Sequence, residues 1–269
     1  MPRSDLAECD ELLYDSFMPE LPEVETVKRG LARLLPGLVV KSVDFNWAKS
    51  FPNTKGDTNA FLVEAEIKAM RRRAKVLIID LSTDYSLIVH LKMTGQLVFV
   101  GNPELRKSNI ENRFGAGHPN DSLIGQLPDK STRVTITFTS GGKLFFNDQR
   151  KFGWVRLLPT NQIDELDFFK KVGPEPLASD FTDKVFIERI RRRANTSIKG
   201  ALLDQTVLAG VGNIYADESL WAAKIHPATK VKDVSDAALK RLKKELPYSS
   251  FPSKKVVRQT EITLSLIHI

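Results

Sequence analysis

Cysteine is almost absent from this sequence of 269 residues, because Cys9 is the only one. A single cysteine excludes an internal disulfide and any zinc site built from several cysteines of this chain. No apolar run is long enough to cross a bilayer. The acidic N-terminal stretch also lacks the basic and apolar regions of a secretory signal. We therefore expect a cytoplasmic protein with no membrane partner and no bound metal.

Acidic residues are fewer than basic ones, with 33 Asp and Glu against 40 Lys and Arg, a net charge of +7. Residues 1–17 contribute −4 to this total, which leaves +11 on the rest of the chain. Such an excess favours a polyanionic partner, nucleic acid first, through phosphate neutralisation and counterion release. A basic enzyme without a nucleic-acid partner fits the charge about as well.

The apolar pattern predicts strands in the first half of the chain and helices in the second. A helix follows Pro22 and is ended by Pro36-Gly37. Residues 101–130 are polar, contain scattered glycine and proline, and are expected to form a long loop or insertion. Strands are predicted at residues 75–81, 86–91 and 133–138, with a hairpin from the last into 143–146, and helices at 186–194, 198–205, 213–223 and 236–246.

Segregated strands and helices predict an α+β protein of two domains. The first domain is expected at residues 18–160 and the second at 177–247, joined by a linker at 161–176. With 42% hydrophobic residues, the chain is long enough to give each domain a core.

The stretch "MPELPEVETVKRGL" begins at Met18 and reads like a translation start. If Met18 is the initiator and is removed, Pro19 carries a free secondary amine, which titrates near ~8. Such an amine attacks an electrophilic sugar carbon and forms an iminium. Glu20 and Glu23 would transfer protons beside it. A proline near a helix start is also a common structural feature.

Three further segments could contact a nucleic acid. Lys75 follows "RRRA" at a strand start, where a solvated basic edge is the ordinary reading. "HLKMTG" holds His90 and Met93; a methionine there could act as a wedge between neighbouring bases, although core packing is commoner. In "NDQRKFG", Arg150 and Phe152 would point the same way from an extended chain and could enter a base stack. An ordinary turn with a buried phenylalanine is the alternative.

"AGVGNIYADE" is a glycine-containing turn that leads into a helix. Backbone N–H groups at such a helix start bind phosphate, and Asn213 adds a side-chain donor. Lys199 lies on the preceding predicted helix, "IKGALLDQ". Two helices joined by this turn are interpreted as a phosphate clamp, with simple helix packing as the competing account.

Taken together, these segments resemble the formamidopyrimidine-DNA glycosylase family. The resemblance spans residues 18–227 and rests on six stretches in the family's order: "MPELPEVETV", "RRRAK", "HLKMTG", "NDQRKFGW", "GPEPL" and "IKGALLDQTVLAGVGNIYADESLW". It implies an N-terminal β-sandwich flanked by helices, followed by a helix–two-turns–helix domain. It also implies a monomer that binds double-stranded DNA containing oxidised bases in a basic cleft, excises oxidised purines such as 8-oxoguanine, and cleaves the strand at the abasic site.

The resemblance also assigns roles to individual residues. Pro19 is the nucleophile, Glu20 the general acid and base, and Glu23 a support for the N-terminus. Lys75 belongs to the catalytic set and, with His90, binds phosphates near the lesion. The remaining assignments are DNA contacts by Lys199, Asn213 and Tyr215, and a triad that fills the gap left by the flipped nucleotide, Met93, Arg150 and Phe152.

Two alternatives and two departures from the family accompany this interpretation. The alternatives are the sister group that removes oxidised pyrimidines, and a DNA-binding protein without catalysis, since residues 1–17 would leave the Pro19 nitrogen an unreactive amide. We expect residues 1–17 to be a non-native extension. Residues 248–269 are expected to be an aberrant, truncated tail that lacks the family's four-cysteine zinc hairpin, so that zinc is expected for the full-length family but not for this chain.

Overall fold

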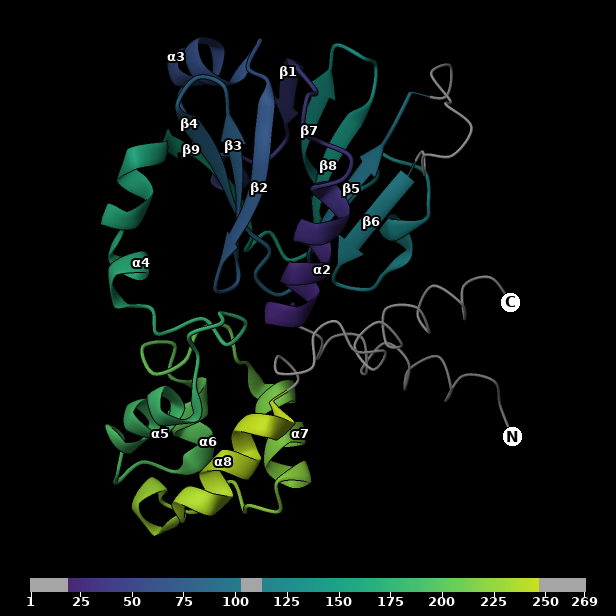
Figure 1. Ribbon diagram of the computed structural model, residues 1–269. Coiled ribbons are helices and arrows are strands. Elements are labelled where there is room, and N and C mark those ends of the chain that lie inside the picture. The colour runs from purple at the N-terminus through teal and green to yellow at the C-terminus, as the bar shows by residue number, and fades with distance from the viewer. Residues whose placement is uncertain (1–18, 103–112, 247–269) are drawn as a thin grey trace, which may run out of the picture. The chain divides into compact units, whose positions relative to one another are not determined.

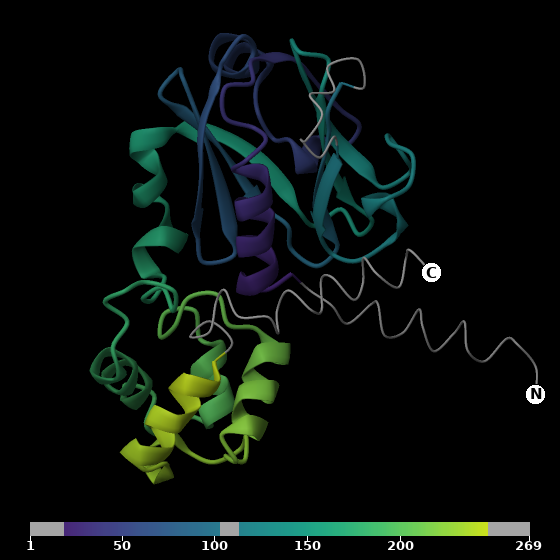
Figure 2. The ribbon, with the colours of Figure 1, turned by 45° about the vertical axis from the view of Figure 1, so that its right-hand side comes forward.

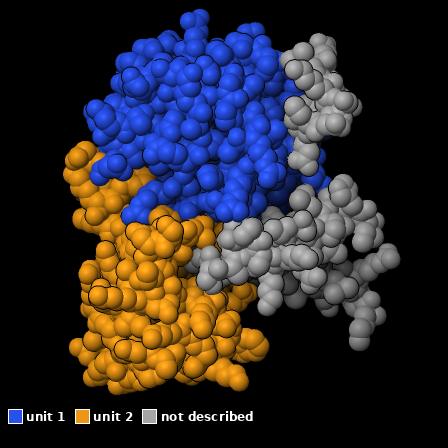
Figure 3. All heavy atoms as spheres, in the orientation of Figure 1, with its two compact units in different colours: residues 1–19, 23–164 blue, residues 20–22, 165–269 orange. Residues whose placement is uncertain are grey.

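The computed structural model describes residues 19–102 and 113–246. They form two compact units, which Figure 3 colours separately. Within the described residues, the first unit comprises Pro19 and residues 23–164, and the second comprises residues 20–22 and 165–246. The division falls within the stretch predicted as a linker. The predicted extension at residues 1–17 and the predicted tail at 248–269 lie outside the described residues.

The first unit contains two antiparallel sheets, one of five strands in the order β1-β7-β8-β5-β6 and one of four in the order β2-β3-β4-β9 (Figure 1). The five-stranded sheet consists of β1 (Val40–Phe45), β7 (Thr132–Phe138), β8 (Lys143–Asp148), β5 (Gly95–Val100) and β6 (Arg113–Gly117). The four-stranded sheet consists of β2 (Ile67–Arg73), β3 (Val76–Leu81), β4 (Tyr85–His90) and β9 (Trp154–Pro159). The predicted strands are confirmed, as is the hairpin from β7 into β8.

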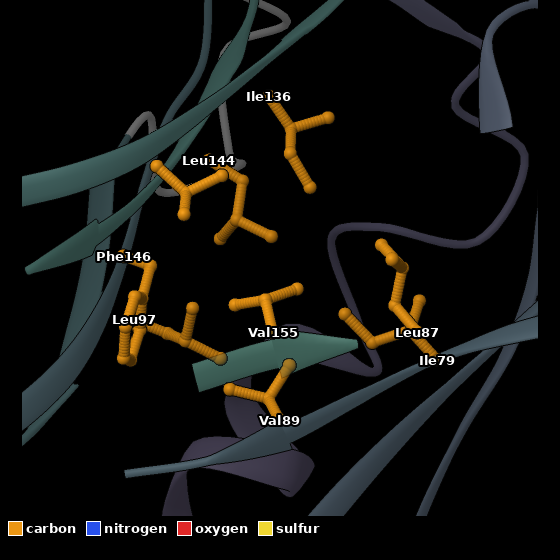
Figure 4. A pocket seen from close by; sticks show the side chains of 9 residues that line it. Ile79, Leu87, Val89, Leu97, Ile136, Leu144, Phe146 and Val155 are labelled. Carbon is orange, nitrogen blue, oxygen red and sulfur yellow. The ribbon is translucent and has the colours of Figure 1, made fainter. Parts of the chain in front are cut away.

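The inner faces of the two sheets share one hydrophobic core. Figure 4 shows a small apolar cavity in this core, lined by side chains from both sheets. Ile79, Leu87 and Val155 come from the four-stranded sheet, and Leu97 and Phe146 from the five-stranded one. An aliphatic and aromatic lining offers no polar partner to a nucleic acid, so the cavity is part of the packing.

Helix α2 (Leu21–Leu31) contributes Val24, Val27 and Leu31 to the same core. The predicted helix is confirmed, but its end at Pro36-Gly37 is wrong. After Leu31 the backbone tightens into i to i+3 hydrogen bonds, such as Leu34 N–H to the Leu31 carbonyl, which satisfy the last carbonyl groups of the helix. Gly30 leaves room for the Phe114 ring of β6, since a Cβ there would lie 1.9 Å from the ring.

The prediction of a long loop over residues 101–130 is wrong over one stretch, because β6 lies within it and pairs with β5. The Arg113 side chain then donates to the backbone carbonyls of Ser122, Leu123 and Gly125, which fixes the following turn. Residues 103–112 lie outside the described residues. Strand β6 escaped detection because its sequence, "RFGAG", contains two glycines and little β propensity.

The second unit is helical (Figure 2). Its helices are α4 (Asp167–Lys171), α5 (Asp183–Arg191), α6 (Ile198–Leu203), α7 (Asn213–Ala222) and α8 (Asp236–Glu245). Residues of α5, α6, α7 and α8 form a second hydrophobic core. The four helices predicted beyond residue 177 are confirmed, and so is the α+β class. The described residues of the two units also contain short helical turns, at Ala48–Ser50, Lys55–Asp57 (α3), Thr58–Leu62, Asp121–Leu123, Thr160–Glu165 and Val231–Asp233.

Candidate active site

Strand register gathers the predicted site residues of the first unit at one end of the sandwich. In the four-stranded sheet, Arg73 pairs with Val76, Val76 with His90, and His90 with Trp154, so these residues form a row across all four strands. The turn that holds Lys75 lies just beyond this row. In the five-stranded sheet, the end pair is Gly95 and Asp148, from which the turn with Met93 and the loop with Arg150 and Phe152 depart.

Asp148 and Thr94 hold these two turns together. The Asp148 side chain is fully buried and accepts hydrogen bonds from the Thr94 hydroxyl and, at 2.7 Å, from the Gly153 N–H. The Thr94 hydroxyl in turn accepts from the Arg150 N–H at 3.0 Å. Both ends of the loop at residues 149–153 are thereby fixed beside the turn that carries Met93.

The prediction that Arg150 and Phe152 point the same way assumed an extended chain, and that assumption is wrong. The loop turns at Lys151, whose φ of 60° lies in the left-handed region. The two side chains nevertheless meet, because the Arg150 guanidinium carbon lies 5.2 Å from the centre of the Phe152 ring. Phe152 is 53% exposed, so the alternative of a buried phenylalanine is excluded, and Met93 is half-buried in the neighbouring turn.

His90 is neutral near physiological pH. Burial, followed by the charges of Lys92 and Lys75, lowers the pKa of its imidazole to about 3. Its Nδ1 accepts a hydrogen bond from the Lys92 N–H at 3.0 Å, so the proton of the neutral ring lies on Nε2. His90 can therefore donate one hydrogen bond to a phosphate oxygen but supplies no positive charge.

Pro19 lies two residues before the start of helix α2, and Glu23 is half-buried in the first turn of that helix. Pro19 is buried, and its nitrogen forms a peptide bond with Met18 in the chain as written. That nitrogen is an amide here, and only a chain that begins at Pro19 would present it as an amine.

In the second unit, Glu20 occupies the N-terminus of helix α7. Helices α5, α6 and α8 are each capped by the side chain of the residue that precedes them, Thr182, Ser197 and Ser235. Helix α7 follows Gly212, which has no side chain for this purpose. The carboxylate of Glu20 takes that place, because it accepts from the Gly212 N–H at 2.9 Å and from the Ile214 N–H at 3.1 Å.

Gly212 and Gly210 have no side chain, and the side chains of Glu20 and Leu21 occupy the space beside them. A Cβ on Gly212 would lie 2.2 Å from the Glu20 carboxyl carbon, and one on Gly210 would lie 2.3 Å from a methyl of Leu21. Gly210 also has a φ of +83°, which a glycine adopts readily. The Gln205 side chain fixes this loop by accepting from the Gly210 N–H and donating to the Val211 carbonyl, both at 2.8 Å.

The predicted phosphate clamp is therefore altered in the structure. The N–H groups expected to bind phosphate at the start of α7 include two that donate to Glu20. Asn213 is exposed at the first position of α7, and the Lys199 ammonium pairs with Asp217 at 2.8 Å one turn further along the same face. Tyr215 is 5% exposed and packs in the core of the second unit.

Sequence reasoning missed Thr94, Asp148 and Gln205. Each lies inside or next to a motif, yet no rule of spacing distinguishes a buried hydrogen-bonding side chain from an exposed one. Of the three, only Asp148 could have been recognised from the sequence. An aspartate between a strand and a loop that ends in glycine often accepts hydrogen bonds from nearby backbone N–H groups.

The described residues contain no cluster of three or more His, Cys, Asp or Glu side chains that could hold a metal ion. A search of the same residues finds no helix with both the length and the apolarity needed to span a bilayer.

Comparison with known proteins identifies two domains. The family model of the formamidopyrimidine-DNA glycosylase N-terminal domain matches residues 18–155, and that of the H2TH domain of the same enzymes matches residues 172–248. The chain is 36% identical over 225 residues to a formamidopyrimidine-DNA glycosylase of Roseobacter denitrificans, which covers 84% of this chain and 74% of the relative. It is 41% identical over 212 residues to that of Herpetosiphon aurantiacus, which covers 78% and 68%.

Solved structures agree with these matches. A complex of Lactococcus lactis Fpg with DNA containing an abasic site is similar with a TM-score of 0.70 and 32% identity, over 85% of this chain and 75% of that one. A further complex of the same protein, with DNA containing an oxidised pyrimidine, has the same TM-score and identity over 85% and 77%. This chain belongs to the formamidopyrimidine-DNA glycosylase family.

Proposed function

We propose that this chain is a DNA glycosylase of base excision repair that removes oxidised purines and then cleaves the strand at the abasic site. The observation that carries this proposal is the pair formed by Pro19 and Glu20. Two backbone N–H groups hold the Glu20 carboxylate at the start of α7, and the next residue toward the N-terminus is the proline. A potential amine nucleophile and a positioned carboxylate are thus consecutive in the chain.

The chemistry requires Pro19 to be the first residue. Its neutral secondary amine then attacks C1′ of the damaged nucleotide, the bond from C1′ to the base breaks, and the base leaves with the electron pair of that bond. A proton reaches the departing base, and the nitrogen loses its own proton. The bond from C1′ to the ring oxygen O4′ then breaks, O4′ takes up a proton to become a hydroxyl, and the nitrogen lone pair forms the double bond of the iminium. Glu20 is the proposed carrier of these protons, and Glu23 supports the N-terminus.

The remaining site residues are proposed to hold the DNA. Lys75 and the neutral His90 would contact phosphates near the lesion from the first unit. Asn213 and Lys199 would contact phosphates from the second, with the proviso that a phosphate at Lys199 competes with Asp217. Tyr215 is buried in the core of the second unit, so its proposed contribution to DNA binding is indirect, through the packing of helix α7.

The triad of Met93, Arg150 and Phe152 is proposed to fill the space of the flipped nucleotide. Its support is the exposed Phe152 ring, the guanidinium beside that ring, and the hydrogen bonds that fix both turns. An apolar ring kept in solvent at a loop tip is suited to enter a base stack.

Oxidised pyrimidines are the second candidate substrate. One relative, Lactococcus lactis Fpg, has been solved with DNA containing an oxidised pyrimidine and, in a mutant form, with DNA containing Fapy-dG. Family membership alone therefore leaves both lesion classes to be compared directly.

The family's zinc hairpin does not fit this chain, since one cysteine cannot supply four thiolate ligands. We derive no catalytic step through zinc. A monomeric, cytoplasmic protein remains our prediction, as does a domain division at residues 18–160 and 177–247.

The test compares the full 269-residue chain with a chain expressed from Met18, whose methionine is removed to expose Pro19. Each is incubated with duplexes containing 8-oxoguanine, thymine glycol or an undamaged base, and strand cleavage is measured. We expect cleavage of the 8-oxoguanine duplex by the Pro19 chain only, because the amide nitrogen of the longer chain is not nucleophilic. Equal cleavage by both chains would contradict the mechanism, and preference for thymine glycol would favour the pyrimidine branch. Binding without cleavage by both would indicate a DNA-binding protein.

A further inference from the structure

Arg72 joins the helix that follows Pro19 to the turn that holds Lys75. Its Nε donates to Glu25 Oε2 at 2.8 Å, and its Nη1 donates to the carbonyl oxygen of Ala74, also at 2.8 Å. Glu25 lies on helix α2, whereas Ala74 and Lys75 form the two-residue turn between β2 and β3. One guanidinium group therefore bonds two separate elements of the first unit.

The pair of Arg72 and Glu25 is buried and ionised. Each side chain is only 6% exposed. Burial alone would raise the pKa of Glu25, but hydrogen bonds from Arg72 and then Arg29 outweigh burial, so the pKa is lowered. The attraction within a buried ion pair offsets the cost of desolvation only if the geometry is good and the remaining N–H donors also form hydrogen bonds. The bond from Arg72 to the Ala74 carbonyl satisfies one of these donors.

The turn that Arg72 contacts is conformationally unusual. Ala74 has a φ of 51°, in the left-handed region that a residue with a Cβ adopts at a cost. Such a conformation persists where the surroundings hold it. The hydrogen bond from Arg72 to the Ala74 carbonyl is one such restraint, and it acts on the residue directly before Lys75.

Figures 1 and 2 show that α2 begins toward the end of the sandwich at which β2 finishes. Glu25 lies in the second turn of this helix, so fixing Glu25 fixes the direction in which the helix start points. The same guanidinium restrains the Lys75 turn. A planar fork can serve two acceptors in fixed directions, which a lysine ammonium on a flexible stem cannot do.

We propose that Arg72 is a positioning residue that sets the geometry between Pro19 and Lys75. This inference rests on the proposed function, in which both residues act on one damaged nucleotide. Arg72 is buried and does not itself touch DNA. Its contribution is to keep the helix start and the turn in one arrangement, because small misplacements of reacting groups slow a reaction strongly.

The test is Arg72→Lys in the chain that begins at Pro19, with Arg29→Lys as the matched control. Arg29 also donates to Glu25, through Nε at 2.8 Å, but it lies on α2 and is 43% exposed. With saturating 8-oxoguanine duplex we expect Arg72→Lys to lower the single-turnover rate about 100-fold. The Kd for DNA should rise by less than about tenfold, because at most the phosphate contact of Lys75 is displaced. Arg29→Lys should lower the rate less than about fivefold, as for an exposed pair.

A second variant guards against simple misfolding. Glu25→Gln retains a side chain of the same size but removes the charge that holds the guanidinium, so it should lower the rate with the same small change in DNA affinity. Equal rates for the Arg72 and Arg29 variants would overturn the inference. So would a loss of DNA affinity in parallel with the rate, because that pattern indicates general damage to this end of the sandwich. If the unsubstituted Pro19 chain fails to cleave, the proposed function fails first and the inference with it.

Discussion

The first unit places its candidate site residues on turns between strands, whereas the second unit places them at the start of one helix. In the first unit, antiparallel register aligns the ends of β3, β4 and β9, and buried side chains such as Asp148 then fix the turns. In the second unit, backbone N–H groups of α7 hold Glu20, and glycines keep the space open.

This difference predicts which substitutions should lower the activity or stability that depends on each unit. The second unit has no room for a Cβ at Gly210 or Gly212, and the Gln205 side chain fixes the loop between them. The first unit depends on a few buried polar groups, such as Asp148 and Thr94, to fix its turns. The predictions below test that contrast, from the largest expected effect to the smallest.

Gly212→Ala should have the largest effect. The new Cβ would lie 2.2 Å from the Glu20 carboxyl carbon, so the carboxylate must leave the start of α7. We expect the single-turnover cleavage rate of the Pro19 chain to fall about 100-fold or more. Gly56→Ala is the control, because its Cβ would meet only the Thr54 hydroxyl, at 3.8 Å. A normal rate for Gly212→Ala would show that this contact is dispensable.

Asp148→Ala should destabilise the first unit. It leaves the Thr94 hydroxyl and the Gly153 N–H without their buried acceptor. We expect the free energy of unfolding, measured with urea, to fall by about 3 kcal/mol. The exposed Asp44→Ala should change it by less than about 0.5 kcal/mol. Similar values for the two variants would contradict the role of Asp148 as the link between the turns.

His90 should make stability depend on pH. Its folded pKa of about 3 lies below the ordinary value of 6.5, so the unfolded chain binds a proton first as the pH falls. Stability is therefore lost between pH 6.5 and 3, by up to about 2 kcal/mol on reaching pH 5. His90→Gln should flatten this region of the urea-derived stability curve. An unchanged curve would mean that His90 is not held neutral by the fold.

Asp217→Asn should have the smallest effect. The pair with Lys199 is partly exposed, so its removal should change the free energy of unfolding by less than about 1 kcal/mol. Because the Lys199 ammonium is then available, DNA affinity at low salt should rise, and the gain should shrink as salt is added. Weaker binding at low salt would argue against a phosphate contact by Lys199.

Local patterns in the sequence predicted helix α2 and helices α5 to α8. Of the nine strands in the described residues they predicted four, β3, β4, β7 and β8, but not β1, β2, β5, β6 or β9. Buried strands such as β3 and β4 are continuous apolar runs, and α8 has a clear helical period after its Ser235 cap. Strand β6 could not be found in this way, because its two glycines remove the pattern and its pairing with β5 is set by the sheet.

The candidate site was predicted by residue identity rather than by geometry. The motifs indicated Pro19, Lys75 and Phe152, but not what holds them. The contact between Glu20 and Gly212 joins residues 192 positions apart, and no local rule connects them. The same holds for Arg72, which reads as one cation in a basic run until the fold buries it.

Borohydride trapping tests the central claim most directly. The chain that begins at Pro19 is mixed with a duplex containing 8-oxoguanine, reduced, digested and analysed by mass spectrometry. The account predicts a deoxyribose adduct on the Pro19 nitrogen, and none when Met18 still precedes it. An adduct on Lys75, or an adduct formed equally by both chains, would contradict it.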